Sequence, residues 1–181
     1  MSPSMHLLQR DEHARTAAFK GANLVHDLVN GGFCTGIIHF LNQTPIDYFS
    51  KRQAQVETAT YGSEFVAARC AVEQIMDLRY TLRMLGVPIL GASWLFCDNK
   101  GVVQSSTIPH SKLAKRWNAL SYHRVREAIA SKYVIFLRID GKKNPADILT
   151  KNLKMLDMKD FTQSLMDFKG DTLSYLPIPT D

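Results

Sequence analysis

The chain has 181 residues, of which 45% are hydrophobic, and carries a formal net charge of +5 at pH 7. The length suits one domain with tails, and the apolar content excludes a disordered protein. The three cysteines, Cys34, Cys70 and Cys97, lie far apart and form no paired motif, which excludes a disulfide framework and a zinc-binding cysteine pair.

The first half of the chain predicts three strands and a long helix. Residues 1–16 are expected to be a tail or a linker. Short strand-like stretches follow at 17–24, 35–41 and 45–50, separated by turn sequences at 30–32 and 42–44, which predicts an antiparallel meander. From Glu57 to Leu85 there is no proline, and apolar residues recur every three or four positions. This pattern predicts a helix that Gly86 and Pro88 end.

The second half alternates strands and helices. A buried strand is expected at 93–97, a short helix at 101–106, a basic helix from His110 or Ser111 to about Lys132, and a strand at 133–139. Pro145 is expected to start a further helix, and residues 157–169 to form the last one. The order predicts an α/β fold with one mixed five-stranded sheet and helices on both faces. We expect the domain to span residues 17–153, with a C-terminal helix and tail at 154–181.

Three acids lie where predicted elements begin or end. Glu64 is in the first turns of the long helix, Asp98 closes the strand at 93–97, and Asp147 lies in the turn after Pro145. In a sheet covered by helices, ligands gather at strand ends and helix starts, and acids that meet there need a cation such as Mg²⁺. Each acid also has an ordinary alternative: a helix cap for Asp98, a dipole contact for Asp147 and a solvated helix position for Glu64.

The basic helix predicted at 110–132 is a second candidate site. Lysines and arginines carry much of the affinity of proteins for phosphate backbones, so such a helix favours a nucleic-acid partner. The alternative is a solvated helix that pairs its own charges, with His123 four residues before Glu127. The cations are Lys112, Lys115, Arg116, Arg124, Arg126 and Lys132.

Four segments together resemble the ribonuclease H domain of copia-type retrotransposon polyproteins. They are SKRQAQVETATYGSEFVAAR (50–69), FCDNKGVVQSS (96–106), LAKRWNALSYHRVREAIA (113–130) and DGKKNPADILTKNL (140–153). The resemblance implies a ribonuclease H fold that hydrolyses the RNA strand of RNA–DNA hybrids with two Mg²⁺ ions, or Mn²⁺, held by four carboxylates. It assigns catalysis and metal binding to Glu64, Asp98 and Asp147. It also implies a reverse transcriptase domain in the same polyprotein.

The fourth carboxylate of that family is absent at its expected position. Relatives have aspartate-alanine-asparagine-leucine on the first strand, whereas this chain has glycine in the first of these positions, Gly21. Asn23 and Asp27 are the nearest polar substitutes, and neither is well placed for the role. The substitution predicts impaired hydrolysis, and Gly21→Asp is expected to bring Mg²⁺-dependent cleavage of a hybrid.

The resemblance also suggests where a hybrid would lie. Hybrids are recognised by their shape and their 2′-hydroxyl groups rather than by sequence. The expected phosphate-binding residues are Lys51, Arg52, Lys115, Arg116, Lys142 and Lys143. The alternative function is a non-catalytic nucleic-acid-binding or scaffold module of the same fold. We expect an intracellular protein, in cytoplasm or nucleus, because the sequence has no membrane-length apolar run and no secretory signal.

Overall fold

A computed structural model describes residues 14–25, 32–42, 44–53, 60–113 and 118–166 of the chain. Its centre is a five-stranded sheet in the order β3-β2-β1-β4-β5. The strands β1 (Thr16–Val25), β2 (Gly32–Leu41) and β3 (Thr44–Arg52) form an antiparallel meander. The strands β4 (Ser93–Cys97) and β5 (Val134–Arg138) extend the sheet in parallel from β1. The predicted mixed five-stranded sheet is confirmed.

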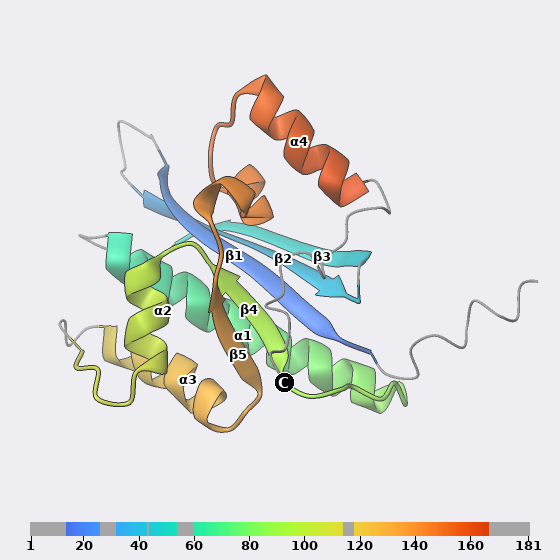
Figure 1. Cartoon of the computed structure of the whole chain (residues 1–181), viewed down its shortest axis with the longest axis vertical. Helices are drawn as coiled ribbons and strands as arrows, with labels where there is room; N and C mark the ends of the chain where they lie inside the picture. The colour runs from blue at the N-terminus through green and yellow to red at the C-terminus, as the bar shows by residue number, and fades with distance from the viewer. Residues whose placement is uncertain (1–13, 26–31, 43, 54–59, 114–117, 167–181) are drawn as a thin grey trace, which may run out of the picture.

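Helices cover both faces of this sheet (Figure 1). The helices α1 (Thr60–Met84), α2 (Lys100–Thr107) and α3 (Ala119–Ala130) lie on one face. The short 3₁₀ helix η4 (Pro145–Leu149) and the helix α4 (Met155–Met166) lie on the other, after a 3₁₀ turn, η3 (Gly141–Lys143). Within the described ranges, no helix is both long and apolar enough to cross a membrane.

The alternation of side chains along β1 separates two apolar cores. Ala18 packs with Ile37 and Phe65 in the core beneath α1, α2 and α3. Phe19, one residue on, packs with Phe96 in the core on the η4 face. Successive residues of a strand face opposite sides of the sheet, so positions 18, 20 and 22 face α1 while 19 and 21 face η4. Because of this alternation, the residue at position 20 contacts α1 and the residue at position 21 faces η4.

The basic helix begins later than the sequence predicts. A start at His110 or Ser111 is wrong, because residues 111–113 are not helical and α3 begins at Ala119. The carbonyl of Ser111 accepts a hydrogen bond from the Tyr122 hydroxyl at 2.6 Å. A side chain of α3 therefore binds the backbone of the non-helical residues 111–113.

Two glycines face each other across β1 and β2 and leave room for η4. Gly21 pairs with Gly36 in the antiparallel register. A Cβ atom at Gly36 would come within 2.6 Å of Thr150 and 2.9 Å of the Ala146 carbonyl oxygen, whereas one at Gly21 would come no closer than 3.4 Å to Asp147. The close approach of η4 to the sheet therefore depends on glycine at position 36 and not at position 21.

We expect Gly36→Ala to lower the free energy of unfolding by about 1–3 kcal/mol, because the new methyl group overpacks the contact with η4. Gly21→Ala is the matched control and should leave stability within about 0.5 kcal/mol of the native value. Urea denaturation followed by circular dichroism measures both. Equal stabilities of the two variants would contradict the prediction.

His39 gives the fold a pH dependence. Its ring is 2% exposed on β2, and Nε2 lies 2.9 Å from Oε1 of Gln74 on α1. Burial disfavours the charged ring and lowers the pKa of His39 from its usual value of 6.5, although Gln74 and Asp47 oppose this. When the pH falls below 6.5, His39 is protonated more in the unfolded chain than in the folded one. The neutral, buried His39 therefore stabilises the fold fully above that pH, and this stabilisation is lost as the pH falls.

The free energy of unfolding should therefore fall as the pH drops through the usual pKa of 6.5 toward the lowered pKa of His39. His39→Gln should reduce that fall, because a glutamine at this position does not titrate. The exposed His123 is the control position, and His123→Gln should keep the native pH profile. The measurement is urea denaturation at each pH, and a profile unchanged by His39→Gln would refute the assignment.

Candidate functional site

The three predicted acids meet at one end of the sheet. Glu64 lies in the first turns of α1, Asp98 follows β4 directly, and Asp147 lies in η4. Glu64 and Asp147 are buried, at 4% and 6% exposure, and Asp98 is partly exposed. Ligand atoms of Glu64, Cys97 and Asp98 lie within 4.8 Å of one another. The charge of Asp98 acts on both Glu64 and Asp147, which makes it the central member of the cluster.

A buried lysine that the sequence analysis did not single out lies against this cluster. Lys20 is on β1, faces α1 and is 0% exposed. Its Nζ forms an ion pair with Oε2 of Glu64 and also donates to the Glu64 backbone carbonyl at 3.1 Å. Burial alone would lower the pKa of Lys20, but the negative charge of Glu64 and its hydrogen bond oppose this effect, and the pKa of Lys20 is raised. Lys20 is therefore a cation at neutral pH.

Burial also shifts the pKa values of Glu64 and Cys97, which lie beside Lys20. Burial raises the pKa of Glu64, with Lys20 opposing and Asp98 adding to the rise. Burial also raises the pKa of the Cys97 thiol to about 11, so this sulfur is protonated at neutral pH. A protonated thiol is a poor metal ligand, because metals bind the thiolate. Cys97 thus fills space beside the acids rather than adding a charge.

Asp147 has a lysine of its own. Its Oδ2 accepts a hydrogen bond from Nζ of Lys151 at 2.7 Å, one turn further along the chain. Burial raises the pKa of Asp147, Lys151 opposes that rise, and the charge of Asp98 adds to it. The position of η4 is fixed by Asn144, whose side chain donates to the Lys20 carbonyl at 3.0 Å and accepts from the Ala146 amide at 3.2 Å.

Gly21 faces this second side of the cluster and offers no ligand. A Cβ atom there would lie 3.4 Å from Oδ1 of Asp147 and 3.5 Å from Nδ2 of Asn144. An acid at position 21 would therefore point toward Asp147. Asn23 does not replace it, because its amide lies 3.4 Å from the Thr150 carbonyl oxygen. Asp27 lies outside the described residues.

The donor set does not fit two divalent cations. Lys20 holds Glu64, Lys151 holds Asp147, and position 21 has no side-chain oxygen. Among the buried side-chain atoms of the described ranges, Oδ1 of Asp98 is one of those without a hydrogen-bond partner. With no side-chain oxygen at position 21 and with lysines bound to Glu64 and Asp147, the site falls short of the free carboxylates that an oxygen-bound Mg²⁺ pair requires.

Exposed cations lie near the end of the sheet that carries the acid cluster. Lys51 and Arg52 are the last two residues of β3. In the sheet register Lys51 pairs with Thr35 of β2, and Thr35 pairs with Ala22 of β1. Lys142 and Lys143 lie exposed in η3, just before the segment that carries Asp147. The structure thus places four of the predicted phosphate-binding residues near the same end of the sheet. The other two, Lys115 and Arg116, lie outside the described residues.

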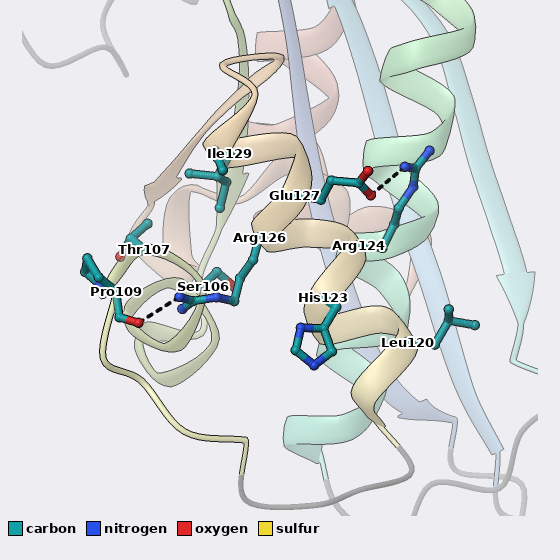
Figure 2. A pocket seen from close by; sticks show the side chains of 10 residues that line it. Ser106, Thr107, Pro109, Leu120, His123, Arg124, Arg126, Glu127 and Ile129 are labelled. Atoms are coloured by element: carbon teal, nitrogen blue, oxygen red, sulfur yellow. Dashed lines mark hydrogen bonds and ion pairs between the residues drawn. The ribbon is translucent and has the colours of Figure 1, made fainter.

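The arginines of α3 are used within the fold. Arg126 donates to the carbonyls of Ser105, Ile108 and Pro109 at 3.0, 2.8 and 2.9 Å and so holds the segment after α2. Arg124 forms an ion pair with Glu127 at 2.9 Å. Both arginines line one pocket, and Figure 2 shows Arg126 pointing toward Pro109 after α2, whereas Arg124 lies beside Glu127 on the other side of α3. Within the described part of this helix, Glu127 thus pairs with Arg124 rather than with His123, and Arg126 binds carbonyls outside the helix.

Comparison with known proteins links the chain to mobile elements. No family model matches it. The Retrovirus-related Pol polyprotein from transposon RE2 of Arabidopsis thaliana is 24% identical over 150 residues, which is 82% of this chain and 10% of that protein. The corresponding polyprotein from transposon TNT 1-94 of Nicotiana tabacum is 26% identical over 133 residues, 74% of this chain and again 10% of the relative. The chain therefore spans about a tenth of these polyproteins.

Solved structures give the fold independently. RNase H1 from the archaeon Halobacterium salinarum has a TM-score of 0.58 at 14% identity, covering 81% of this chain and 98% of its own. LC11-RNase H1, from compost, solved in complex with an RNA/DNA hybrid, has a TM-score of 0.59 at 14% identity, covering 75% of this chain and 94% of its own. Sequence and fold agree: the chain has a ribonuclease H-like fold and is similar in sequence to a part of retrotransposon Pol polyproteins.

Proposed function

We propose that this is a copia-type ribonuclease H domain that holds RNA–DNA hybrids and has lost most or all of the two-metal hydrolysis of its family. The observation that carries the proposal is the state of the acid cluster. Gly21 supplies no ligand, and two of the three remaining acids are bound by lysines. Hydrolysis with two metal ions needs carboxylates that are free to bind both ions.

Binding of a hybrid is supported by the exposed cations near the cluster. Lys51, Arg52, Lys142 and Lys143 are all exposed near the edge where the acids lie. Cations in this arrangement can contact successive phosphates without reading bases. The LC11-RNase H1 and foamy viral protease-reverse transcriptase structures, both of this fold, were solved with an RNA/DNA hybrid.

The proposed domain organisation follows the relatives. Residues 17–153 form the nuclease-like domain, residues 1–16 a tail or linker, and residues 154–181 a C-terminal helix and tail. A reverse transcriptase domain of the same polyprotein is the proposed partner, since the relatives are Pol polyproteins. A scaffold role without nucleic acid is the competing function, and salt-dependent binding of a hybrid would argue against it.

The chain as it stands should not cleave a labelled RNA–DNA hybrid in Mg²⁺ or in Mn²⁺ above the level of Asp98→Asn. The reason is that too few oxygen ligands remain to hold two ions at the scissile phosphate. The measurement is gel analysis of the labelled RNA strand over time. Cleavage by the native chain that disappears in Asp98→Asn would contradict the proposed loss of chemistry.

Hybrid binding should persist and depend on salt. In fluorescence anisotropy at several salt concentrations, Lys142→Ala and Lys51→Ala should each weaken binding and reduce the salt slope by about one. Arg83→Ala is the matched control, because this exposed arginine ends α1 at the far end from Glu64. If no variant differs from the control, the hybrid does not lie over the acid cluster, and the assignment of these residues fails.

A further inference from the structure

We infer that the Lys20 ammonium takes the place of a divalent cation on Glu64, so that the acid cluster is neutralised from within the chain and Glu64 is withheld from metal. This inference does not rest on hybrid binding. It concerns the chemistry of the cluster alone, and metal titration without nucleic acid can test it. Its failure is therefore distinguishable from failure of the proposed function.

The contacts of Lys20 are those of a bound cation. Its Nζ lies against a carboxylate oxygen and a backbone carbonyl of Glu64, and the side chain is 0% exposed. Oxygen ligands of these two kinds also bind hard metal ions. The lysine carries a single charge on a tether from β1, so its position is fixed by the fold rather than by the concentration of an ion in solution.

A metal ion at Glu64 would have to displace this ammonium. Both cations would otherwise stand a few ångströms apart in a buried region, where like charges repel strongly. Displacement would leave the Lys20 ammonium buried without its partner, which is also costly. Lys20 is fully buried against Glu64, so the displaced ammonium would have to move before it reached water. A divalent cation is therefore at a disadvantage at Glu64 in this chain.

The neighbouring position on β1 changes the other face of the cluster. Lys20 faces α1 and brings a cation to Glu64, while Gly21 faces η4 and brings no acid to Asp147. Lys151 then pairs with Asp147. Three carboxylates and two ammonium groups leave one formal negative charge, which falls on the partly exposed Asp98. The cluster is thus close to neutral without any bound ion.

The inference changes the outcome expected for restoring the missing acid. Gly21→Asp alone adds a ligand on the η4 side but leaves Glu64 bound to Lys20. We therefore expect that the single substitution does not create a Glu64-dependent metal site. Removing the lysine as well, in Lys20→Met/Gly21→Asp, should free both sides of the cluster.

The first experiment titrates the folded chain with Mn²⁺, with the free ion followed by electron paramagnetic resonance. The native protein and Glu64→Gln should bind Mn²⁺ equally weakly, because Lys20 already excludes the ion from Glu64. Thermal melting of the native chain should be the same in chelator and in millimolar Mn²⁺. Tight binding to the native chain that Glu64→Gln abolishes would overturn the inference, and this comparison needs no Lys20 variant to fold.

The second experiment removes the lysine. Lys20→Met keeps the length of the side chain and removes its charge, so it should melt at a lower temperature in chelator and recover in Mn²⁺, with Mn²⁺ affinity at least about tenfold above native. Lys20→Met/Glu64→Gln should lose this recovery, because no unpaired carboxylate remains at Glu64. Lys154→Met is the matched control, since that lysine is exposed, is not part of the cluster and should leave the response native. A Lys20→Met protein that folds and binds Mn²⁺ no better than the control would refute the inference.

Discussion

The ion pair between Lys20 and Glu64 joins the central strand of the sheet to the first turns of α1. Each partner is almost completely removed from water, and a buried charge is tolerated only when its partner and hydrogen bonds replace that water. The pair therefore fixes two things at once. It sets how α1 lies on β1, and it decides that the carboxylate nearest the strand is already occupied. The backbone of Lys20 also positions η4, because its carbonyl accepts a hydrogen bond from the side chain of Asn144.

The positions of the acids follow from the sheet and would be the same whatever bound them. Asp98 ends β4, Glu64 begins α1, and η4 brings Asp147 over the glycines of β1 and β2. Strand ends and helix starts converge in such folds, so ligand positions persist when the ligands change. A ribonuclease H-like scaffold can therefore retain its shape while single substitutions at positions 20 and 21 alter the charge of its site.

The sequence was sufficient for the order of elements and for the convergence of three acids, because hydrophobic period, turn residues and motifs are local signals. It was insufficient for Lys20, whose partner is 44 residues away. The lysine within the apolar stretch AAFKGA could have predicted this pair. Both faces of a central strand are covered, and a lysine buried there needs an anionic partner. The bond from Tyr122 to Ser111, which joins α3 to the non-helical residues 111–113, is a tertiary contact that the local pattern does not reveal.

On the proposed function, the same replacement of metal ions by lysines can explain both the loss of hydrolysis and the retention of a nucleic-acid-binding surface. A cluster of free carboxylates repels phosphates unless metal ions bridge them. Here Lys20 and Lys151 remove most of that repulsion permanently, while Lys51, Arg52, Lys142 and Lys143 remain exposed near the cluster. On the proposed function, a hybrid could approach this edge without metal. On the same proposal, hybrid binding would depend less on divalent ions, and monovalent salt would be its main competitor.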